Sequence, residues 1–489
     1  MEHSFSQHSD SQTPAWLLLG ICGAGMRSFA QHLHAVGIRV IGADRDHHAL
    51  HLLSLSSNLP LTLLDWSAVQ RGLTPAVSTV VHSIAVPSDG PELTALRRRG
   101  LSVLSLPQAI ALQFSSIPQL CIAGTHGKST TTGMLWWILH HAGRSTARYV
   151  GAEFQLSDAL PASEFPGLHP ANPGFTSAVL EACEYRDSFL TLQPSLCVLT
   201  GIESDHFDWF TTPGAAAASF KGFLGRVQPG GALIHSADCP ISRHLAARYR
   251  TGPAISWSTA TRGADWQLIV HPARAGSLTS SAQLLPVHGG RPIDLRLRIP
   301  GDHNLMNATA AVLAAMQQGI APEDAARLLT SFPGMRRRFE HRGTWRGADL
   351  IDDYAHHPTA VLVTLKTVRQ VYPGRRVLAV FEPHQISRTQ RLLSDFAAAL
   401  AIADDVLVVP VLAARESASM ATRTELSREL VRQICSIGGR AKLVGDLDQV
   451  PQKLDDAVHS GDLLITMGAG RTNLIHDEIH RTIQRDSAA

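Results

Sequence analysis

A short glycine-containing loop carries the clearest chemical signal in this chain of 489 residues. The segment reads G-T-H-G-K-S, follows the apolar run Gln119–Ala123 and precedes the helix-like stretch Thr131–His141. Glycines let backbone N–H groups approach phosphate oxygens, and the start of the following helix adds partial positive charge. A lysine here reaches the β- and γ-phosphates, and the hydroxyl after it is a Mg²⁺ ligand. The pattern predicts an ATP or GTP site that comprises Gly124, Thr125, His126, Gly127, Lys128, Ser129 and Thr130.

Carboxylates follow two later apolar runs, Ser177–Leu180 and Leu196–Thr200, where a Mg²⁺–nucleotide complex would need them. An acid at the end of a buried strand beside a phosphate loop is the usual position of a metal ligand. A solvated acidic loop is the alternative for each residue taken alone. The candidates after these two runs are Glu181, Glu184, Asp205, His206 and Asp208.

A second glycine-rich turn, G-I-C-G-A-G-M, lies near the N-terminus between an apolar strand and the helix-like stretch Arg27–Val36. An acid, Asp44, ends the next strand, as in sites where glycines approach a pyrophosphate and the acid binds a ribose. The spacing departs from G-x-G-x-x-G, so a nicotinamide cofactor and a UDP-sugar both remain open. Because the chain already holds one nucleotide loop, we favour a UDP-linked substrate, with candidate contacts Gly20, Gly23, Gly25, Met26, Asp44 and Ser83.

Polar groups gather at four later segments of the chain, near residues 303–307, 336–338, 353–356 and 384–388. A helix start carries amide and imidazole groups suited to adenine or phosphate, unless Asn304 simply caps that helix. The basic run Arg336–Arg338 suits a γ-phosphate, with a solvated basic face as the alternative. Two strand ends follow, and strand ends are where open α/β sheets bind ligands. The candidates at these four places are His303, Asn304, Asn307, Arg338, Asp353, Tyr354, His356, His384 and Arg388.

Parallel sheets are needed to position these groups. Apolar strands alternate with helix-like stretches in three blocks, which predicts an α/β fold of three domains. The strand candidates of the last block are residues 350–352, 376–381, 406–410, 441–444 and 462–467. We expect a Rossmann-like N-terminal domain, a P-loop-type central ATPase domain and a Rossmann-like C-terminal domain. The expected limits are a disordered tail at 1–15 and domains at 16–112, 113–332 and 333–489.

Composition excludes several classes of function. Hydrophobic residues make up 44% and charged residues 17%, which is typical of globular domains. A net charge of +2 argues against nucleic acid as a partner bound through bulk positive charge. The six cysteines form no C-x-x-C pair, which favours a reducing cytoplasm. The chain shows neither a signal peptide nor an apolar run long enough for membrane insertion.

In order, the motifs resemble those of the Mur ligases of bacterial cell-wall synthesis, from about Trp16 into the C-terminal block. G-I-C-G-A-G-M resembles their uridine-diphosphate loop, and A-G-T-H-G-K-S-T-T-T resembles their ATP loop. L-E-A-C-E-Y and I-E-S-D-H-F-D resemble their metal-binding stretches. H-N-L-M-N-A, R-R-F-E, D-D-Y-A-H-H-P-T and P-H-Q-I-S-R-T follow in the family's order.

The resemblance implies an ATP-dependent ligase that uses Mg²⁺ and activates a carboxylate as an acyl phosphate in peptidoglycan synthesis. Within the family, the motifs are most similar to those of the member that joins L-alanine to UDP-N-acetylmuramate. The alternatives are the member that recycles a preformed tripeptide, a non-catalytic homologue that only binds the nucleotide sugar, and an oxidoreductase. Glycine or L-serine could replace L-alanine, and we expect a monomer or a homodimer.

The resemblance also implies individual roles. Lys128, Ser129, Asn304, Asn307, Arg338 and Asp353 would hold ATP, and Ser129, Glu181 and His206 would hold Mg²⁺. Tyr354, His356, His384 and Arg388 would face the substrate carboxylate and the amine. The general base would be His206, His356 or His384. Lys128, His206, His356, His384 and Arg388 are thus the expected catalytic set.

Three positions depart from the family's pattern. Gln385 replaces an arginine that is common in P-H-R, which puts one contact to the substrate carboxylate in doubt. Cys183 replaces a common aspartate, and Gly201 replaces a common asparagine. These changes put local contacts in doubt more than the class of reaction.

Overall fold

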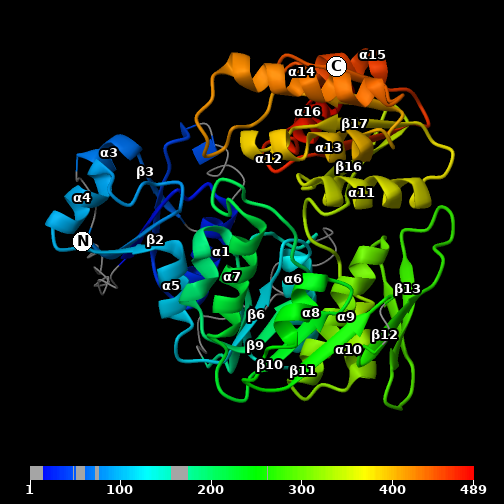
Figure 1. Ribbon diagram of the computed structural model, residues 1–489. Coiled ribbons are helices and arrows are strands. Elements are labelled where there is room, and N and C mark those ends of the chain that lie inside the picture. The colour runs from blue at the N-terminus through cyan, green and yellow to red at the C-terminus, as the bar shows by residue number, and fades with distance from the viewer. Residues whose placement is uncertain are drawn as a thin grey trace, which may run out of the picture. The chain divides into compact units, whose positions relative to one another are not determined.

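Three sheets, built mainly of parallel strands, organise the chain in the computed structural model, so the predicted α/β class is confirmed (Figure 1). The structure describes residues 15–47, 49–50, 61–71, 76–155, 174–260 and 263–488, without the side chains of 213 and 482–488. The predicted tail lies outside these residues except for Ala15, which begins the first strand. The chain forms two units: residues 1–118, 145–151 and 161–178 make the first, and 119–144, 152–160 and 179–489 the second.

The sheet of the first unit has the order β3-β2-β1-β4-β5, and all its pairings are parallel. Its central strand, A-W-L-L-L, is buried at every position, as a strand covered on both faces must be. The strand order reverses between β1 and β4, and the carboxyl ends of strands at such a switch point are where open α/β sheets bind ligands. The strands are β1 (Ala15–Leu19), β2 (Val40–Ala43), β3 (Thr62–Leu64), β4 (Val77–His82) and β5 (Ser102–Ser105). The helices are α1 (Ala24–Ala35), α3 (Trp66–Gln70), α4 (Pro91–Arg98) and α5 (Leu106–Gln113), and β7 (Thr146–Tyr149) packs against α1.

The central sheet holds the order β14-β13-β12-β11-β10-β9-β6-β8. Helix α6 follows the phosphate loop and is buried from Ser129 to Leu139, with small hydroxyl residues in its first turn and the apolar run G-M-L-W-W-I-L after them. It packs against α9 and α10. The strands are β6 (Gln119–Ala123), β8 (Ser177–Glu181), β9 (Pro194–Leu199), β10 (Ala232–Ser236), β11 (Ala254–Ser258), β12 (Trp266–Val270), β13 (Ser280–Pro286) and β14 (Ile293–Leu297). The helices are α6 (Lys128–His141), the 3₁₀ helix η3 (Tyr185–Thr191), α7 (Pro213–Leu224), α8 (Pro240–Ala246), α9 (Asp302–Met316) and α10 (Pro322–Leu329).

The C-terminal sheet has the order β15-β16-β20-β17-β18-β19, with apolar cores on both faces. Five strands are parallel, and the sequence indicated all five; β15, which pairs antiparallel with β16, was not expected. The strands are β15 (Glu340–Trp345), β16 (Ala348–Asp353), β17 (Val377–Phe381), β18 (Asp405–Val408), β19 (Ala441–Leu443) and β20 (Leu463–Met467). The helices are α11 (Pro358–Val371), α12 (Ile386–Arg391), α13 (Leu393–Leu400), α14 (Met420–Ser436), α15 (Val450–Ala457) and α16 (Leu474–Ala488).

The two predicted limits between domains fall outside the strands. The limit at 112/113 lies at the end of α5, and that at 332/333 lies between α10 and β15. Both limits stay predictions. Within the described ranges, no helix combines the length and the apolar character needed to span a bilayer.

Candidate functional site

The phosphate loop has the strand–loop–helix form that its sequence predicts, with α6 beginning at Lys128, three residues earlier than expected. Two of its glycines have positive φ angles, +135° at Gly124 and +77° at Gly127. A Cβ atom at Gly124 would lie 2.2 Å from Oγ1 of Thr200, and one at Gly127 would lie 2.3 Å from Oδ1 of Asn307. Both positions therefore require glycine, and the loop is held between the end of β9 and helix α9.

Lys128 forms a buried ion pair inside this loop. Its ammonium lies 2.9 Å from Oε2 of Glu184, and the two side chains are 13% and 3% exposed. Burial by itself raises the pKa of Glu184, but the positive charge of Lys128 outweighs it and leaves that pKa below its usual value. The sequence offered Glu184 only as a candidate metal ligand, because nothing local shows that it faces Lys128. Phosphate oxygens would compete with Glu184 for the ammonium.

The residues predicted to hold Mg²⁺ lie near the ion pair of Lys128 and Glu184. The hydroxyl of Ser129 donates to Oε1 of Glu181 at 2.9 Å, so these two oxygens lie side by side. Nε2 of His206 lies 3.5 Å from Oε1 of Glu184. An ionised carboxylate only accepts hydrogen bonds, so the proton of His206 belongs on Nε2. Its Nδ1 is then a buried lone pair that has no hydrogen-bond partner in the structure.

This orphaned nitrogen, together with the two oxygens, fits a divalent cation. A buried acceptor without a donor is costly unless a ligand supplies the missing partner. The backbone of His206 has a φ of +52°, a conformation that a residue other than glycine rarely adopts and that tertiary contacts must hold. The predicted set of Ser129, Glu181 and His206 therefore has the chemistry needed for Mg²⁺.

Two asparagine side chains of α9, Asn304 and Asn307, lie at the phosphate loop. Nδ2 of Asn304 donates to the carbonyl of Pro300 at 2.7 Å, and Nδ2 of Asn307 donates to Oδ1 of Asn304 at 3.4 Å. Gly301 is the cap residue of α9, so the alternative that Asn304 only caps the helix is wrong. Asn307 instead packs under Gly127.

Three predicted ATP contacts lie near one another where α9 meets the C-terminal sheet. Burial and the charge of Arg338 lower the pKa of His303 to about 4. Burial raises the pKa of Asp353 to about 6, although Arg338 and two backbone donors oppose it. Those donors, at Phe339 and Ala355, each lie 2.8 Å from the carboxylate. Arg338 thus lies close enough to His303 and Asp353 to lower the pKa of each, a proximity that its place in a basic run did not show.

The four residues predicted for the carboxylate and the amine also come together. The guanidinium of Arg338 lies 4.9 Å above the ring of Tyr354, whose centroid is 5.0 Å from that of His356. The rings of His356 and His384 are 5.8 Å apart. Burial, followed by the charge of Arg388, lowers the pKa of His356 well below its usual value and that of His384 to about 3. Both rings are therefore neutral near pH 7.

Hydrogen bonds fix the tautomer of each ring. Nδ1 of His356 lies 2.8 Å from the carbonyl of Tyr354, which can only accept, so Nδ1 carries the proton and Nε2 keeps a lone pair. Nδ1 of His384 lies 3.3 Å from a guanidinium nitrogen of Arg388, which can only donate, so its proton is on Nε2. The first ring is therefore a proton acceptor and the second a donor.

A buried ion pair joins the loop after β9 to helix α12. Nε of Arg388 lies 2.7 Å from Oδ1 of Asp205, and the side chains are 1% and 8% exposed. The same oxygen accepts a hydrogen bond from the backbone of His206 at 2.7 Å. Arg388 also donates to the carbonyl of His384 at 3.1 Å. The pair thus sets the positions of two predicted catalytic histidines.

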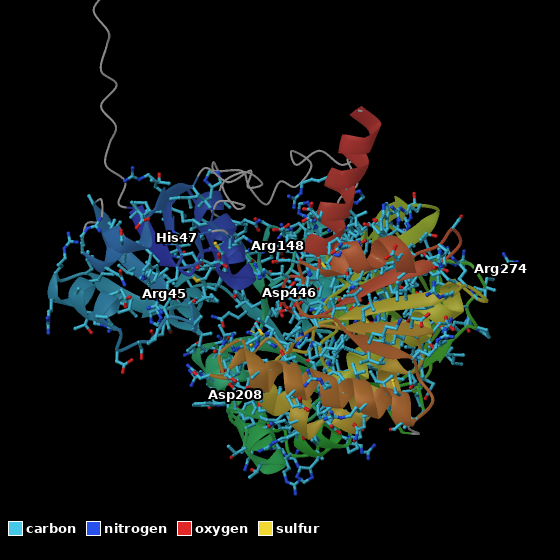
Figure 2. All side chains as sticks on the ribbon, turned by 90° about the horizontal axis from the view of Figure 1, so that it is seen from above. Arg45, His47, Arg148, Asp208, Arg274 and Asp446 are labelled. Carbon is cyan, nitrogen blue, oxygen red and sulfur yellow. The ribbon has the colours of Figure 1, made fainter. Side chains whose placement is uncertain are left out.

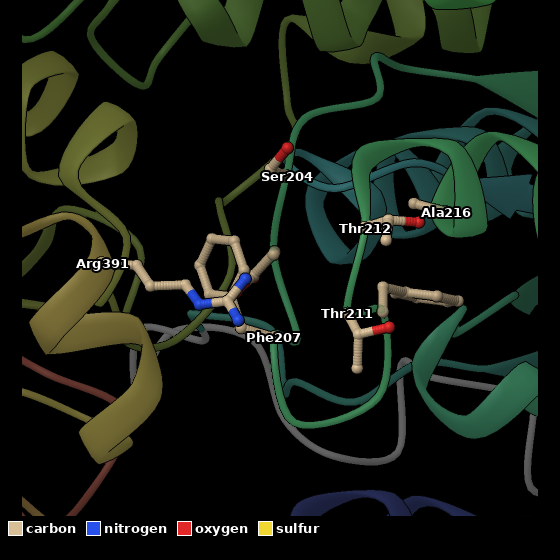
Figure 3. A pocket seen from close by; sticks show the side chains of 8 residues that line it. Ser204, Phe207, Thr211, Thr212, Ala216 and Arg391 are labelled. Atoms are coloured by element: carbon tan, nitrogen blue, oxygen red, sulfur yellow. The ribbon is translucent and has the colours of Figure 1, made fainter.

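Gln385 makes a parallel contact between the same two segments. Its backbone has a φ of +72°, and its amide donates to Oδ1 of Asp208 at 3.3 Å. Asp208, labelled in Figure 2, also accepts from the hydroxyl of Tyr185 at 2.6 Å. At this departure from the expected P-H-R pattern, the chain therefore uses the amide of Gln385 to hold the loop. Asp205 also lines a small pocket in which Arg391 lies over the ring of Phe207, and the other lining residues are not among the predicted ligand contacts (Figure 3).

In the first unit, the glycine turn meets the carboxyl ends of β1, β2 and β4. A Cβ atom at Gly20 would lie 2.5 Å from Oγ of Ser83, so this position also needs glycine. The carboxylate of Asp44 accepts the backbone N–H of Cys22 at 2.9 Å. Helix α1 follows the cap residue Gly23, which has no side-chain cap, so its first N–H groups face the turn. Gly25 lies in the first turn, whereas the side chain of Met26 is buried in the core.

Replacing Asp205 by asparagine tests the ion pair. The change leaves the guanidinium of Arg388 buried without a countercharge, which we expect to lower the free energy of unfolding by about 3–5 kcal/mol. Although burial raises the pKa of Asp205, Arg388 and His206 lower it far below the usual range, so its contribution is present above about pH 4 and is lost as pH falls further. Urea denaturation between pH 3 and pH 7 measures both effects. The exposed Asp395→Asn is the control, and equal stability of the two variants would contradict the prediction.

Family models and curated relatives both match this chain. The models of the Mur ligase family match three stretches of the chain: the catalytic domain at residues 18–116, the middle domain at 122–315 and the glutamate ligase domain at 337–470. Two curated UDP-N-acetylmuramate–L-alanine ligases align over most of the chain. That of Kineococcus radiotolerans is 36% identical, covering 94% of both chains, and that of Mycolicibacterium vanbaalenii is 35% identical, covering 94% and 95%.

Solved structures show the same fold. The UDP-N-acetylmuramate–alanine ligase of Thermotoga maritima superposes with a TM-score of 0.76 at 21% identity, covering 96% of this chain and 99% of its own. A murein peptide ligase of Psychrobacter arcticus gives 0.72 at 24% identity, covering 96% and 98%. At these identities the solved structures show only that the fold is shared. The curated relatives and the family models also match this chain in sequence. The chain belongs to the Mur ligase family.

Proposed function

We propose that this protein joins L-alanine to the carboxylate of UDP-N-acetylmuramate, at the expense of ATP, in peptidoglycan synthesis. The products would be UDP-N-acetylmuramoyl-L-alanine, ADP and phosphate. The observation that carries the proposal is the Asp205–Arg388 pair, because it links the loop that bears His206, near the phosphate loop, to the cluster of His356 and His384. Nearly full-length relatives that bear the name of this activity support the choice of substrates.

The phosphate loop would carry out the first half of the reaction. A carboxylate is a poor electrophile, and transfer of the γ-phosphoryl group converts it into an acyl phosphate with a good leaving group. Lys128 would exchange its contact with Glu184 for one with the phosphates, and Arg338 would approach from the C-terminal domain. Mg²⁺, held by Ser129, Glu181 and His206, would neutralise phosphate charge.

In the second half of the reaction, His356 and His384 would take different roles because their rings are protonated on different nitrogens. Attack on the acyl phosphate needs a neutral amine, so a base must remove a proton from the alanine ammonium. Nε2 of His356 has the free lone pair that this task needs, whereas Nε2 of His384 carries a proton and suits a carboxylate oxygen. Among the three histidines that the sequence left open, we therefore assign the base to His356. His206 would serve the cation instead.

We place the reaction in the cytoplasm, where ATP is available. All six cysteines are free thiols, which agrees with a reducing compartment.

The proposal is tested by phosphate release from ATP in the presence of UDP-N-acetylmuramate and a panel of amines. We expect release with L-alanine to exceed release with glycine or L-serine, because a pocket that fits one methyl group discriminates by about 10- to 200-fold. Faster release with the tripeptide L-alanyl-γ-D-glutamyl-meso-diaminopimelate would instead identify a recycling ligase. Absence of release with every amine would overturn the ligase assignment.

Replacing Lys128 by alanine tests the ATP site. We expect ADP formation to fall by about 10²–10³-fold or more, because a charge that stabilises the transferring phosphoryl group is lost. Coupled detection of ADP at saturating substrates measures the change. The exposed Lys221→Ala is the matched control and keeps the wild-type rate. Equal rates for the two variants would rule out this lysine as a phosphate contact.

Replacing His356 by glutamine tests the base. The variant keeps a hydrogen-bonding group but lacks a proton acceptor of suitable basicity, so ligation should fall by about 10²-fold. Formation of the acyl phosphate does not need this base, so positional isotope exchange in ATP without alanine should stay within about twofold of wild type. The exposed His459→Gln serves as the control. Parallel losses in exchange and ligation would show that His356 only supports the fold of the site.

A further inference from the structure

Two histidines and a glutamate converge beside the phosphate loop, apart from the residues proposed to hold Mg²⁺. His126 belongs to the loop, Glu203 follows β9, and His357 is the residue before α11. Nε2 of His126 lies 3.2 Å from Oε2 of Glu203, and Nδ1 of His357 lies 3.9 Å from the same oxygen. Ligand atoms of all three lie within 4.8 Å of one another. Three donors from three chain segments thus surround one point.

Two of these donors face each other without a proton between them. Nε2 of His357 lies 3.3 Å from the carbonyl of Ser204, which can only accept, so its proton is on Nε2, and the lone pair of Nδ1 accepts the backbone N–H of Thr359 at 3.3 Å. The hydrogen bond from His126 lowers the pKa of Glu203 to about 2, so its carboxylate is ionised. Burial lowers the pKa of His357 to about 4, so its ring is neutral. A cation between Glu203 and His357 would replace two hydrogen bonds: that of Nδ1 of His357 with the backbone of Thr359, and that of Nε2 of His126 with Glu203, from which the His126 proton would leave.

Neighbouring groups fix the orientation of these donors. The hydroxyl of Thr359 donates to Oε2 of Glu203 at 2.8 Å, and the hydroxyl of Thr125 accepts from the backbone of Glu203 at 2.9 Å. The contact with Ser204 holds the ring of His357. Hydrogen bonds of this kind orient the ligands of metal sites and raise their basicity.

The donor set selects a class of ion. Two imidazole nitrogens and one carboxylate suit Zn²⁺, Co²⁺ or Ni²⁺, whereas Mg²⁺ prefers an octahedron of oxygens. Bonds of about 2.0–2.2 Å in a tetrahedral site place ligand atoms about 3.4 Å apart. The 3.2 Å and 3.9 Å separations are close to this value. The side chains of His126 and Glu203 are 32% and 45% exposed, which leaves an entry path and room for water as a fourth ligand.

We propose that His126, Glu203 and His357 form a binding site for a divalent transition-metal cation of the Zn²⁺ class, separate from the Mg²⁺ site. The ion would tie the phosphate loop to the first turn of α11 in the C-terminal domain. A ligase that must release ADP and open between turnovers is slowed by such a tie. Micromolar Zn²⁺ would therefore inhibit the reaction, a consequence that rests on the proposed function, whereas binding of the ion does not.

Binding is tested with Co²⁺ on the full chain after removal of metals with a chelator. Excess Mg²⁺ and ADP are present throughout, so that the Mg²⁺ site is filled. We expect one Co²⁺ per chain, with visible absorption of a four-coordinate site. Glu203→Gln and His357→Asn should each weaken binding by at least about 10–100-fold. Asparagine keeps the cap on the backbone of Thr359, so the second variant spares the start of α11.

The matched control is His271→Asn, an exposed histidine that follows β12, and it should bind Co²⁺ as the wild type does. Circular dichroism and thermal unfolding without metal show whether each variant is folded. Equal Co²⁺ affinity of the wild type and both site variants would overturn the proposal and assign binding to other histidines. Octahedral absorption would do so as well. Because no turnover is needed, these results stand even if the ligase assay fails.

Discussion

The arrangement of this site depends on the ion pair between Asp205 and Arg388. Both side chains are almost excluded from water, and removing charges from water costs several kcal/mol for each ion. The pair offsets that cost only when its geometry is good and its remaining hydrogen-bonding groups are satisfied. Asp205 does this through the backbone of His206, and Arg388 does it through the carbonyl of His384. The two predicted catalytic histidines thus take their positions from one electrostatic requirement.

A second constraint is the narrow space around the phosphate loop. Side chains from β9 and α9 approach the loop so closely that Gly124 and Gly127 cannot carry a Cβ atom. The approach brings Asn307 against the loop backbone and encloses Lys128 with Glu184. Enclosure strengthens each electrostatic contact there, because less water screens it. The same crowding places His126 beside Glu203, where the proposed transition-metal site begins.

Burial also decides the state of the histidines in the site. His356, His384, His303 and His357 have lowered pKa values, with burial as the leading cause in each case. Neutral rings can serve as proton acceptors, hydrogen-bond donors or metal ligands, and the hydrogen bond at one nitrogen decides which role the other can take. Histidine can therefore supply a proton acceptor, a hydrogen-bond donor and a metal ligand within the same site.

The sequence by itself determined the local parts of this protein. The phosphate loop, the glycine turn at Gly20 and the polar strand ends at Asp353 and His384 are each encoded within about ten residues, because strand and helix periodicity and glycine positions act locally. The α/β class and the five parallel strands of the C-terminal sheet follow from the same patterns. The antiparallel β15 was missed because its sequence, E-H-R-G-T-W, is mostly polar and contains no apolar run.

Only the tertiary structure decided which of these groups are partners. Lys128 and Glu184 are 56 residues apart, and Asp205 and Arg388 are 183 apart, so no local pattern relates them. Their pairing depends on the order of strands in the sheets and on the packing of the C-terminal domain against the loop after β9. The tautomers of His356 and His384 depend in turn on those contacts. Residue types thus fixed which chemistry was available, and packing fixed which atoms can take part in it, because desolvation and hydrogen-bond geometry exist only in the folded chain.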